Sequence, residues 1–202
     1  MNIKARYLYI IGVALLAADV ITKIMVKTSM TLGENISVFG SWFNIHFIEN
    51  PGAAWGFELG GDSGKLILSL FRIVAVSFVA WYITRLHRRN APAGVQIAAV
   101  AILIGAFGNI VDSAFFGLIF SESTHYAVSH FTAWGEGYGT FLHGDVVDML
   151  YFPIIEIDHV PSWVPIWGGG PFVFFSAIFN LADSYISVAM IYLILFQRKF
   201  FK

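Results

Sequence analysis

Long apolar runs are the dominant pattern in this sequence. Four of them approach the roughly 20 apolar residues that a helix needs to cross about 30 Å of hydrocarbon. They cover residues 7–27, 66–84, 95–120 and 171–196. We therefore predict an all-α membrane protein with four transmembrane helices, in which residues 1–202 form a single integral-membrane domain.

A different pattern fills the segment between the first two runs. The stretch ISVFGSWFNIHFIENPGAAWGF, residues 36–57, alternates bulky apolar and polar residues and then reaches a Pro-Gly pair. Alternation is typical of a half-buried strand, and Pro-Gly is typical of a turn. We expect a small cradle that contains strands between the first and second helices, and a long loop between the third and fourth.

Basic residues outside the spans show which side of the membrane each connection occupies. They cluster before the first run, in the connection at residues 85–94, and after the last run. The two long connections, residues 28–64 and 121–170, hold acidic residues but no Lys or Arg. Because cytoplasmic segments carry the excess of Lys and Arg, we predict cytoplasmic termini and extracytoplasmic long connections.

The first run has an alternative interpretation as a cleaved signal peptide. Lys4 and Arg6 precede it, and the small residues of ALLAAD offer a possible cleavage point. We prefer a membrane helix, because the apolar character resumes at Val20 and because losing this run would leave the basic C-terminus outside.

The amino-acid composition restricts both the class of protein and the side chains that could catalyse a reaction. The chain is 57% hydrophobic and 12% charged, which is too apolar for an ordinary soluble domain. It has no Cys, so a disulfide and a thiolate nucleophile are excluded. Catalysis would have to come from Asp, Glu, His, Ser, Lys or a metal. No basic patch suited to nucleic acid is present.

Polar residues within the spans come in pairs that are three or four positions apart. The pairs are Asp19 with Lys23, Asn109 with Asp112, and Asn180 with Asp183. Such spacing puts both members on one helix face. An Asp in a membrane helix costs about 2.5–3.5 kcal/mol on insertion scales, so it usually marks a function or a partner. With the predicted orientation, these pairs can form one polar cluster near the outer surface, below loop residues Asn50, Asp145 and Asp148.

Each of these residues also has a structural interpretation. The Asp19–Lys23 pair would let one charge extend outward along its own helix. The amides of Asn109 and Asn180 would hold helices together. Arg72, inside the second run, is more typical of a paired structural residue than of a catalytic one. Only Asp183, which has no basic neighbour on its own helix, lacks such an explanation.

The motif HGDVVD suggests a metal site only weakly. It supplies His143, Asp145 and Asp148, but no further His lies at a ligand spacing. The loop histidines His125, His130 and His159 are expected at the surface.

Five segments in chain order resemble the signature segments of the lipoprotein signal peptidases, the type II signal peptidases of bacteria. They are DVITK (19–23), NPGAAWG (50–56), GAFGNIVDS (105–113), GDVVDML (144–150) and FNLADS (179–184). The resemblance runs from the first span to the last, and five motifs in order are far more specific than any one of them.

The resemblance implies an aspartic endopeptidase of the bacterial inner membrane, with its site toward the extracytoplasmic face. Such an enzyme removes signal peptides from prolipoproteins by cleaving before a Cys that bears a diacylglyceryl group. The family's catalytic pair maps onto Asp148 and Asp183. Positions that support the site or bind substrate map onto Asp19, Lys23, Asn50, Gly52, Asn109, Asp112 and Asn180. The resemblance also implies no metal or other cofactor, contact with membrane lipids, and inhibition by globomycin-type compounds. We expect a monomer.

Two departures from the family pattern concern the substrate entrance. Ser113 stands where the family usually has Arg, so a contact there is absent or is supplied from elsewhere, for instance by Arg72. The segments between Ser113 and Gly144, and between Asp148 and Asn180, are longer than expected.

Two carboxylates suffice for the implied reaction. Held close together, one keeps its proton while the other stays ionised, so the pair offers both an acid and a base. Which aspartate is the base is open at this point. Intramembrane Asp and Asn also suit a small transporter, or a scaffold without catalysis. A transporter would need polar residues in the inner halves of the spans, which are nearly free of ionisable groups.

Overall fold

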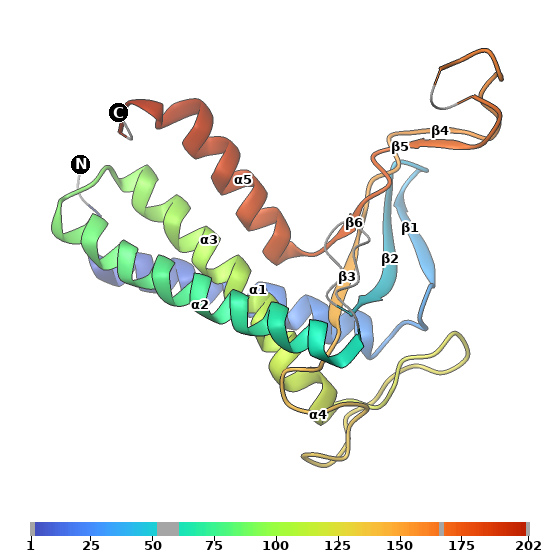
Figure 1. The fold of residues 1–202 in the computed structure, drawn as a ribbon, viewed down its shortest axis with the longest axis horizontal. Helices are drawn as coiled ribbons and strands as arrows, with labels where there is room; N and C mark the ends of the chain where they lie inside the picture. The colour runs from blue at the N-terminus through green and yellow to red at the C-terminus, as the bar shows by residue number, and fades with distance from the viewer. Residues whose placement is uncertain (1–2, 52–60, 166–167, 201–202) are drawn as a thin grey trace.

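The computed structural model describes residues 3–51, 61–165 and 168–200. Within this part of the chain, a bundle of helices carries antiparallel strands at one end (Figure 1). α1 begins, α5 ends and α2 turns into α3 at the opposite end of the bundle (Figure 1). The strands and the long connections therefore share one end of the molecule, which we call the site end.

α3 is the central helix of the bundle and contacts α1, α2 and α5. The long helices are α1 (Ala5–Lys27), α2 (Gly61–Arg88), α3 (Ala93–Val111) and α5 (Leu181–Phe196). A π-helical turn η1 (Asp112–Phe116) follows α3 and leads into the short α4 (Gly117–Ile119), and a 3-10 turn η2 (Arg198–Phe200) follows α5. A π-helical turn inside a helix is frequently found at a functional site.

Among the described residues, three helices are long and apolar enough to cross a membrane. These are Ala5–Lys27, Gly64–Arg88 and Ala93–Ile119, which match the first three predicted spans closely. The fourth prediction was wrong over residues 171–180, because this segment contains the strands at 172–174 and 178–179 and α5 begins only at Leu181. α5 has 16 residues and is apolar, so it reaches about 24 Å.

Glycines let α3 and α5 approach closely. A Cβ at Gly105 would lie 2.4 Å from the carbonyl oxygen of Ala182, and one at Gly94 would lie 2.0 Å from the hydroxyl of Tyr192. Small residues at such contacts are the usual device for packing membrane helices. The close approach brings the first turn of α5 against the end of α3 that carries Asn109.

The strands form two sheets, so the all-α prediction was wrong. The four-stranded sheet has the order β1-β2-β3-β6, from β1 (Asn35–Phe39), β2 (Phe43–Asn50), β3 (Val146–Tyr151) and β6 (Ile178–Phe179). A separate two-stranded ribbon pairs β4 (Ile155–Ile157) with β5 (Phe172–Phe174). β1 and β2 lie where the alternating pattern predicts them, whereas the other strands come from the long connection between α4 and α5.

The register of β3 decides which way its side chains point. Val147 and Met149 are buried in an apolar cluster that includes Phe47 of β2 and Phe116 of η1. Since successive side chains of a strand point to opposite faces, Asp148 faces away from this cluster. β2 pairs with β3 so that Ile48 lies opposite Asp148, beyond an irregularity between Ile45 and Ile48.

Candidate active site

Lys23 of α1 lies at the centre of a buried polar cluster. Its Nζ is 2.9 Å from Oδ2 of Asp19 and 2.8 Å from Oδ2 of Asp112. It also donates a 2.9 Å hydrogen bond to Oδ1 of Asn109. The side chain is fully buried, so the interpretation of Lys23 as a charge that extends outward was wrong.

Both carboxylates around Lys23 also accept bonds from the backbone of other elements. Oδ1 of Asp19 accepts a 2.9 Å bond from the N–H of Ala182, at the start of α5. Oδ2 of Asp112 accepts a 3.4 Å bond from the N–H of Val147 in β3. The two acids thereby hold α5 and β3 in place beside the cluster.

Gly108 of α3 makes room for this arrangement. A Cβ at this position would lie 2.5 Å from Oδ2 of Asp19, closer than a carbon and an oxygen can approach without a shift. The glycine is therefore needed for α3 to pack against the acidic side chain of α1.

Asn109 and Asn180 connect the buried lysine to two further carboxylates. Oδ1 of Asn109 faces Lys23, which can only donate, and it also accepts a 3.1 Å bond from Nδ2 of Asn180. Nδ2 of Asn109 donates a 2.9 Å bond to Oδ1 of Asp183. Nδ2 of Asn180 donates a 2.7 Å bond to Oδ1 of Asp148.

The first turn of α5 positions Asp183. Oδ1 of Asn180 accepts a 3.0 Å bond from the N–H of Asp183, and Oδ2 of Asp183 accepts a 3.4 Å bond from the N–H of Asn180. These reciprocal bonds form a capping box, which also explains why the helix starts at Leu181. A carboxylate in the first turn is stabilised as the anion by the helix dipole.

Asp148 has a pKa well above the ordinary value. Burial is the largest cause and the charge of Asp183 is the second, and together they raise the pKa to about 7. Hydrogen bonds from Asn180 and Asn50 oppose the rise by stabilising the anion. Nδ2 of Asn50 lies 3.4 Å from Oδ2 of Asp148. Near neutral pH, Asp148 therefore holds its proton far more readily than an ordinary carboxyl.

The structure gathers most of the candidate residues into this one cluster. It includes Asp19, Lys23, Asn50, Asn109, Asp112, Asp148, Asn180 and Asp183. Gly52 lies outside the described residues. Asp145 is turned away and forms a 2.6 Å ion pair with Lys65.

The loop histidines take no part in the cluster. His143 contacts Thr140 and the carbonyl of Phe141, while His125, His130 and His159 are exposed. Within the part of the chain that the structure describes, no three metal-ligating side chains of the His, Cys, Asp or Glu type come together.

Ser113 stands where the family pattern usually has Arg, and Arg72 is the residue named above as a possible substitute for that contact. Ser113 is buried, its hydroxyl donates to the carbonyl of Asn109, and its carbonyl accepts a 2.9 Å bond from the N–H of Gly144. The position is thus filled by packing between η1 and the segment before β3. Arg72 of α2 is half-buried and lies close enough to Asp183, Asp112 and Asp148 for their charges to act on it.

A second buried cation went unpredicted. Lys27 is fully buried, forms an ion pair with Glu49 of β2, and donates a 2.8 Å bond to Oγ of Ser123. Its Nζ also lies 4.8 Å from the ring centre of Tyr138. Lys27 follows Lys23 by four residues, so both lie on one face of the helix. This spacing is the sequence feature that could have indicated the burial of Lys27.

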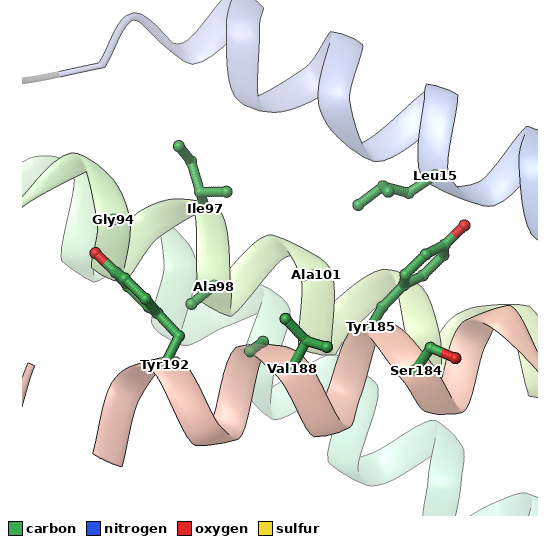
Figure 2. A pocket seen from close by; sticks show the side chains of 10 residues that line it. Leu15, Gly94, Ile97, Ala98, Ala101, Ser184, Tyr185, Val188 and Tyr192 are labelled. Atoms are coloured by element: carbon green, nitrogen blue, oxygen red, sulfur yellow. The ribbon is translucent and has the colours of Figure 1, made fainter. Parts of the chain in front are cut away.

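An apolar pocket of about 450 Å³ lies between α1, α3 and α5 (Figure 2). Leu15 lines it from α1, and Ile97 and Ala101 line it from α3. Ser184 and Tyr185 line it from α5, directly after Asp183 in the chain. The pocket therefore begins beside the carboxylate cluster and offers almost only apolar atoms.

The family profile described as Signal peptidase (SPase) II matches residues 11–199. The chain belongs to this family. It is 49% identical to the lipoprotein signal peptidase of Porphyromonas gingivalis over 183 residues, which cover 90% of this chain and 78% of that protein. It is 34% identical to the lipoprotein signal peptidase of Amoebophilus asiaticus over 192 residues, covering 93% and 76% of the two chains.

The fold also has relatives among solved structures. A bacterial membrane enzyme determined by the in meso method at 2.3 Å resolution superposes with a TM-score of 0.61 at 22% identity. The match covers 98% of this chain and 91% of that one. A second such structure, at 1.9 Å resolution, matches with the same TM-score and covers 96% of its chain. Membership of the signal peptidase II family makes the protein a protease, and its apolar helices make it a multi-pass membrane protein.

Proposed function

We propose that this protein removes signal peptides from diacylglyceryl-modified prolipoproteins as an aspartic endopeptidase, with Asp148 and Asp183 as the catalytic pair. The observation that carries the proposal is the short path of hydrogen bonds between the two carboxylates. Asn180 donates to Asp148 and caps Asp183, while Asn109 donates to Asp183. No basic side chain forms an ion pair with either carboxylate among the described residues.

The raised pKa of Asp148 assigns the starting protonation state. In the proposed mechanism Asp148, whose pKa is raised to about 7, supplies the acid of the pair, and Asp183, in the first turn of α5, supplies the base. Asp183 takes a proton from water as the water attacks the scissile carbonyl. Asp148 donates its hydrogen bond to the carbonyl oxygen, and the leaving amine receives a proton from the pair. No covalent intermediate forms, and the pair titrates as a unit.

Lys23 helps to position the proposed catalytic pair without forming an ion pair with either carboxylate. Lys23 is neutralised by Asp19 and Asp112, and it reaches Asp183 only through the amide of Asn109. A direct ion pair would keep Asp183 ionised and weaken it as a base. The intervening amide of Asn109 instead fixes the position of Asp183 through a hydrogen bond.

The apolar pocket explains why the substrate would carry a lipid. Its lining begins at Ser184, next to Asp183, and continues along α3 and α5. An acyl chain or the apolar part of the signal peptide can occupy it while the scissile bond lies at the carboxylates. Anchoring of this kind fixes the reacting atoms at one depth before any peptide side chain is recognised.

The distribution of charge gives the orientation. Arg85, Arg88 and Arg89 lie at the end of the bundle where the α2–α3 turn is found, and the long connections at the site end carry no Lys or Arg. By the positive-inside rule, the termini are cytoplasmic and the carboxylates lie toward the extracytoplasmic face of the bacterial inner membrane. The protein acts there as a monomer on lipid-anchored substrate, without a metal or other cofactor, and globomycin-type compounds would occupy the same site.

The test is cleavage of a diacylglyceryl-modified lipobox peptide by the purified protein in bilayers. We expect cleavage immediately before the modified Cys, and a loss of roughly 10²–10⁴-fold in kcat for Asp148→Asn and for Asp183→Asn. Asp158→Asn is the matched control, since Asp158 is exposed and lies in the same segment between the two catalytic residues. Undiminished cleavage by Asp183→Asn would overturn the proposal, and loss of wild-type activity with a chelator would show that a metal is required.

A further inference from the structure

Another pocket, of about 260 Å³, lies at the end of the bundle opposite the site end. The α2–α3 turn and the C-terminal end of the chain are both found there (Figure 1). The last turns of α2, the residue after it and η2 supply the lining, which consists of Tyr82, Arg85, Leu86, Arg89 and Phe200. The N–H of Arg89 donates to the carbonyl of Arg85, so the helical turn continues past the end of α2. Helical spacing therefore puts both arginines on one face.

The packing beneath this pocket fixes the turn that carries the arginines. Leu86 is buried in an apolar cluster at the α2–α3 turn, and Leu193 of α5 packs against that cluster. On the next residue, a ring nitrogen of His87 lies 2.9 Å from Oε1 of Gln96 in α3. Nε2 of Gln96 donates a 2.7 Å bond to the carbonyl of Ala91. The end of α2 is thereby held against both α3 and α5.

The two arginines of the pocket have no acidic partner. Neither Arg85 nor Arg89 forms an ion pair with another described residue. The Arg85 guanidinium instead lies 5.4 Å from the ring centre of Trp81. The segments that include this end of the bundle, residues 1–18, 73–111 and 184–202, contain no Asp or Glu. Because like charges four residues apart repel each other, an anion that binds here gains two cationic partners and removes that repulsion.

The residues of the lining suit a phosphate group. A guanidinium presents a planar fork of donors that matches the oxygens of a phosphate in a bidentate arrangement. The hydroxyl of Tyr82 is a further donor among the lining side chains. Leu86 and Phe200 are apolar and add no competing acceptor from their side chains.

The position of the pocket along α2 indicates a lipid as the source of the phosphate. The stretch that is long and apolar enough to cross a membrane is Gly64–Arg88, so Arg85 and Arg89 lie at its end, where headgroups are found. The rings of Phe78 and Trp81 contact each other beside the pocket, and both side chains are exposed. Acyl chains can pack along these two rings while the phosphate reaches the arginines. Basic pockets between membrane helices are typical sites for anionic headgroups.

We propose that this pocket binds the headgroup phosphate of an anionic phospholipid through Arg85 and Arg89. The bound lipid connects the end of α2 to η2, and so the α2–α3 turn to the C-terminal end of α5. General attraction between basic residues and anionic lipid would involve every arginine at this end equally. A built site instead depends on the two arginines of the pocket and not on Arg88, which lies between them in the chain and does not line it. The site is separate from the carboxylate cluster.

Native mass spectrometry of the full chain identifies the retained lipid. The protein is released from nanodiscs that contain equal amounts of phosphatidylcholine and phosphatidylglycerol, and the ratio of the two bound lipids is measured. Arg85→Gln/Arg89→Gln removes the proposed ligands. Arg6→Gln/Arg88→Gln is the matched control, because it removes the same charge at the same end of the bundle from residues outside the pocket. Thermal unfolding in phosphatidylcholine alone shows whether each variant keeps its fold. Arg85→Lys/Arg89→Lys, which keeps the charge and loses the planar fork, replaces the first variant if that one does not fold.

We expect the wild type to retain phosphatidylglycerol in preference to phosphatidylcholine, and this preference to fall about 10- to 30-fold in Arg85→Gln/Arg89→Gln. The lysine variant should show a smaller loss in the same direction. Phosphatidylglycerol should also raise the unfolding midpoint of the wild type and of the control, but not that of Arg85→Gln/Arg89→Gln.

Three results would overturn the inference. The first is a preference that survives in both pocket variants. The second is an equal loss in the pocket variant and the control, which would reduce the effect to general charge attraction. The third is displacement of the lipid by inorganic phosphate or by soluble glycerophosphate, which would assign the pocket to a soluble anion. None of these readouts depends on peptidase activity.

Discussion

The side chain of Asn180 donates a 2.7 Å hydrogen bond to Asp148, and its other amide atom caps the helix that carries Asp183. One residue thereby fixes the position of β3 relative to the first turn of α5. The two carboxylates come from segments 35 positions apart (Asp148 to Asp183) in the chain. Their relative placement depends on this amide.

Two substitutions separate the roles of Asn180. Asn180→Ala removes both the cap and the bond to Asp148, whereas Asn180→Ser keeps a side chain that can cap the helix but cannot reach Asp148. Leaving a buried polar group without its hydrogen-bond partner costs about 1–3 kcal/mol, so we expect kcat to fall about 5- to 100-fold in both. Only Asn180→Ala should lose about a further 1 kcal/mol of stability. Full activity in Asn180→Ser would show that the bond to Asp148 is dispensable.

The raised pKa of Asp148 predicts the alkaline limb of the activity profile. The proposed reaction needs Asp148 protonated, and its pKa is raised to about 7 by burial and by Asp183. The value of kcat/KM should therefore fall as the pH rises through about 7. Asn50 stabilises the anion of Asp148, so Asn50→Ala should raise this pKa and move the limb to higher pH. A limb that stays in place, or moves to lower pH, would contradict the assignment.

The same pKa has a consequence for stability. The pKa of Asp148 is higher in the folded protein than its ordinary value of 3.8, so the folded state binds the proton more tightly. The contribution of the Asp148 carboxyl to the free energy of unfolding is then fully present below about pH 4, and it is lost as the pH rises toward about 7. Asp148→Asn should flatten this part of the dependence of the unfolding midpoint on pH. An unchanged slope in the variant would assign the dependence to other groups.

The sequence predicted the members of the cluster better than their connections. Helical spacing alone placed Asp19 and Lys23 on one face. The orientation predicted from the basic residues then put the polar residues of three spans at the same end of the bundle. It did not show that backbone N–H groups of Ala182 and Val147 complete the cluster, because such bonds depend on tertiary placement. It also did not show the burial of Lys27, since a lysine at the end of a membrane helix ordinarily reaches water.

The error over residues 171–180 has a physical origin. Apolar runs are read as spans by their length, and this run is continuous with that of α5. The helix nevertheless starts at Leu181, because Asn180 and Asp183 form a capping box. Phe179 instead pairs with Leu150 of β3, as a strand residue. A short apolar run of this kind cannot be assigned to strand or helix by composition alone.

Gly108 offers a steric test of the cluster. Gly108→Ala puts a Cβ 2.5 Å from Oδ2 of Asp19, so Asp19 or α3 must shift away from Lys23. Overpacking of this kind costs about 1–3 kcal/mol, and we expect reduced stability together with reduced kcat. Gly12→Ala is the matched control on α1, since its nearest neighbours lie at 3.5 Å, an ordinary contact. Thermal unfolding and peptide cleavage should single out Gly108; equal effects at both glycines would indicate a general effect of helix substitution.

Lys27 allows the second buried ion pair to be separated from the catalytic cluster. Lys27→Met leaves Glu49 with a buried charge and without its cation, which costs about 3–5 kcal/mol in comparable pairs. Glu49 precedes Asn50, so the displacement should reach Asp148 and lower kcat/KM as well. The double variant Lys27→Met/Glu49→Gln removes both charges and should recover most of the stability. If it also recovers kcat/KM, the ion pair acts by holding β2 in position. If activity stays low while stability returns, the charge of Lys27 itself contributes to the reaction, contrary to the proposed mechanism.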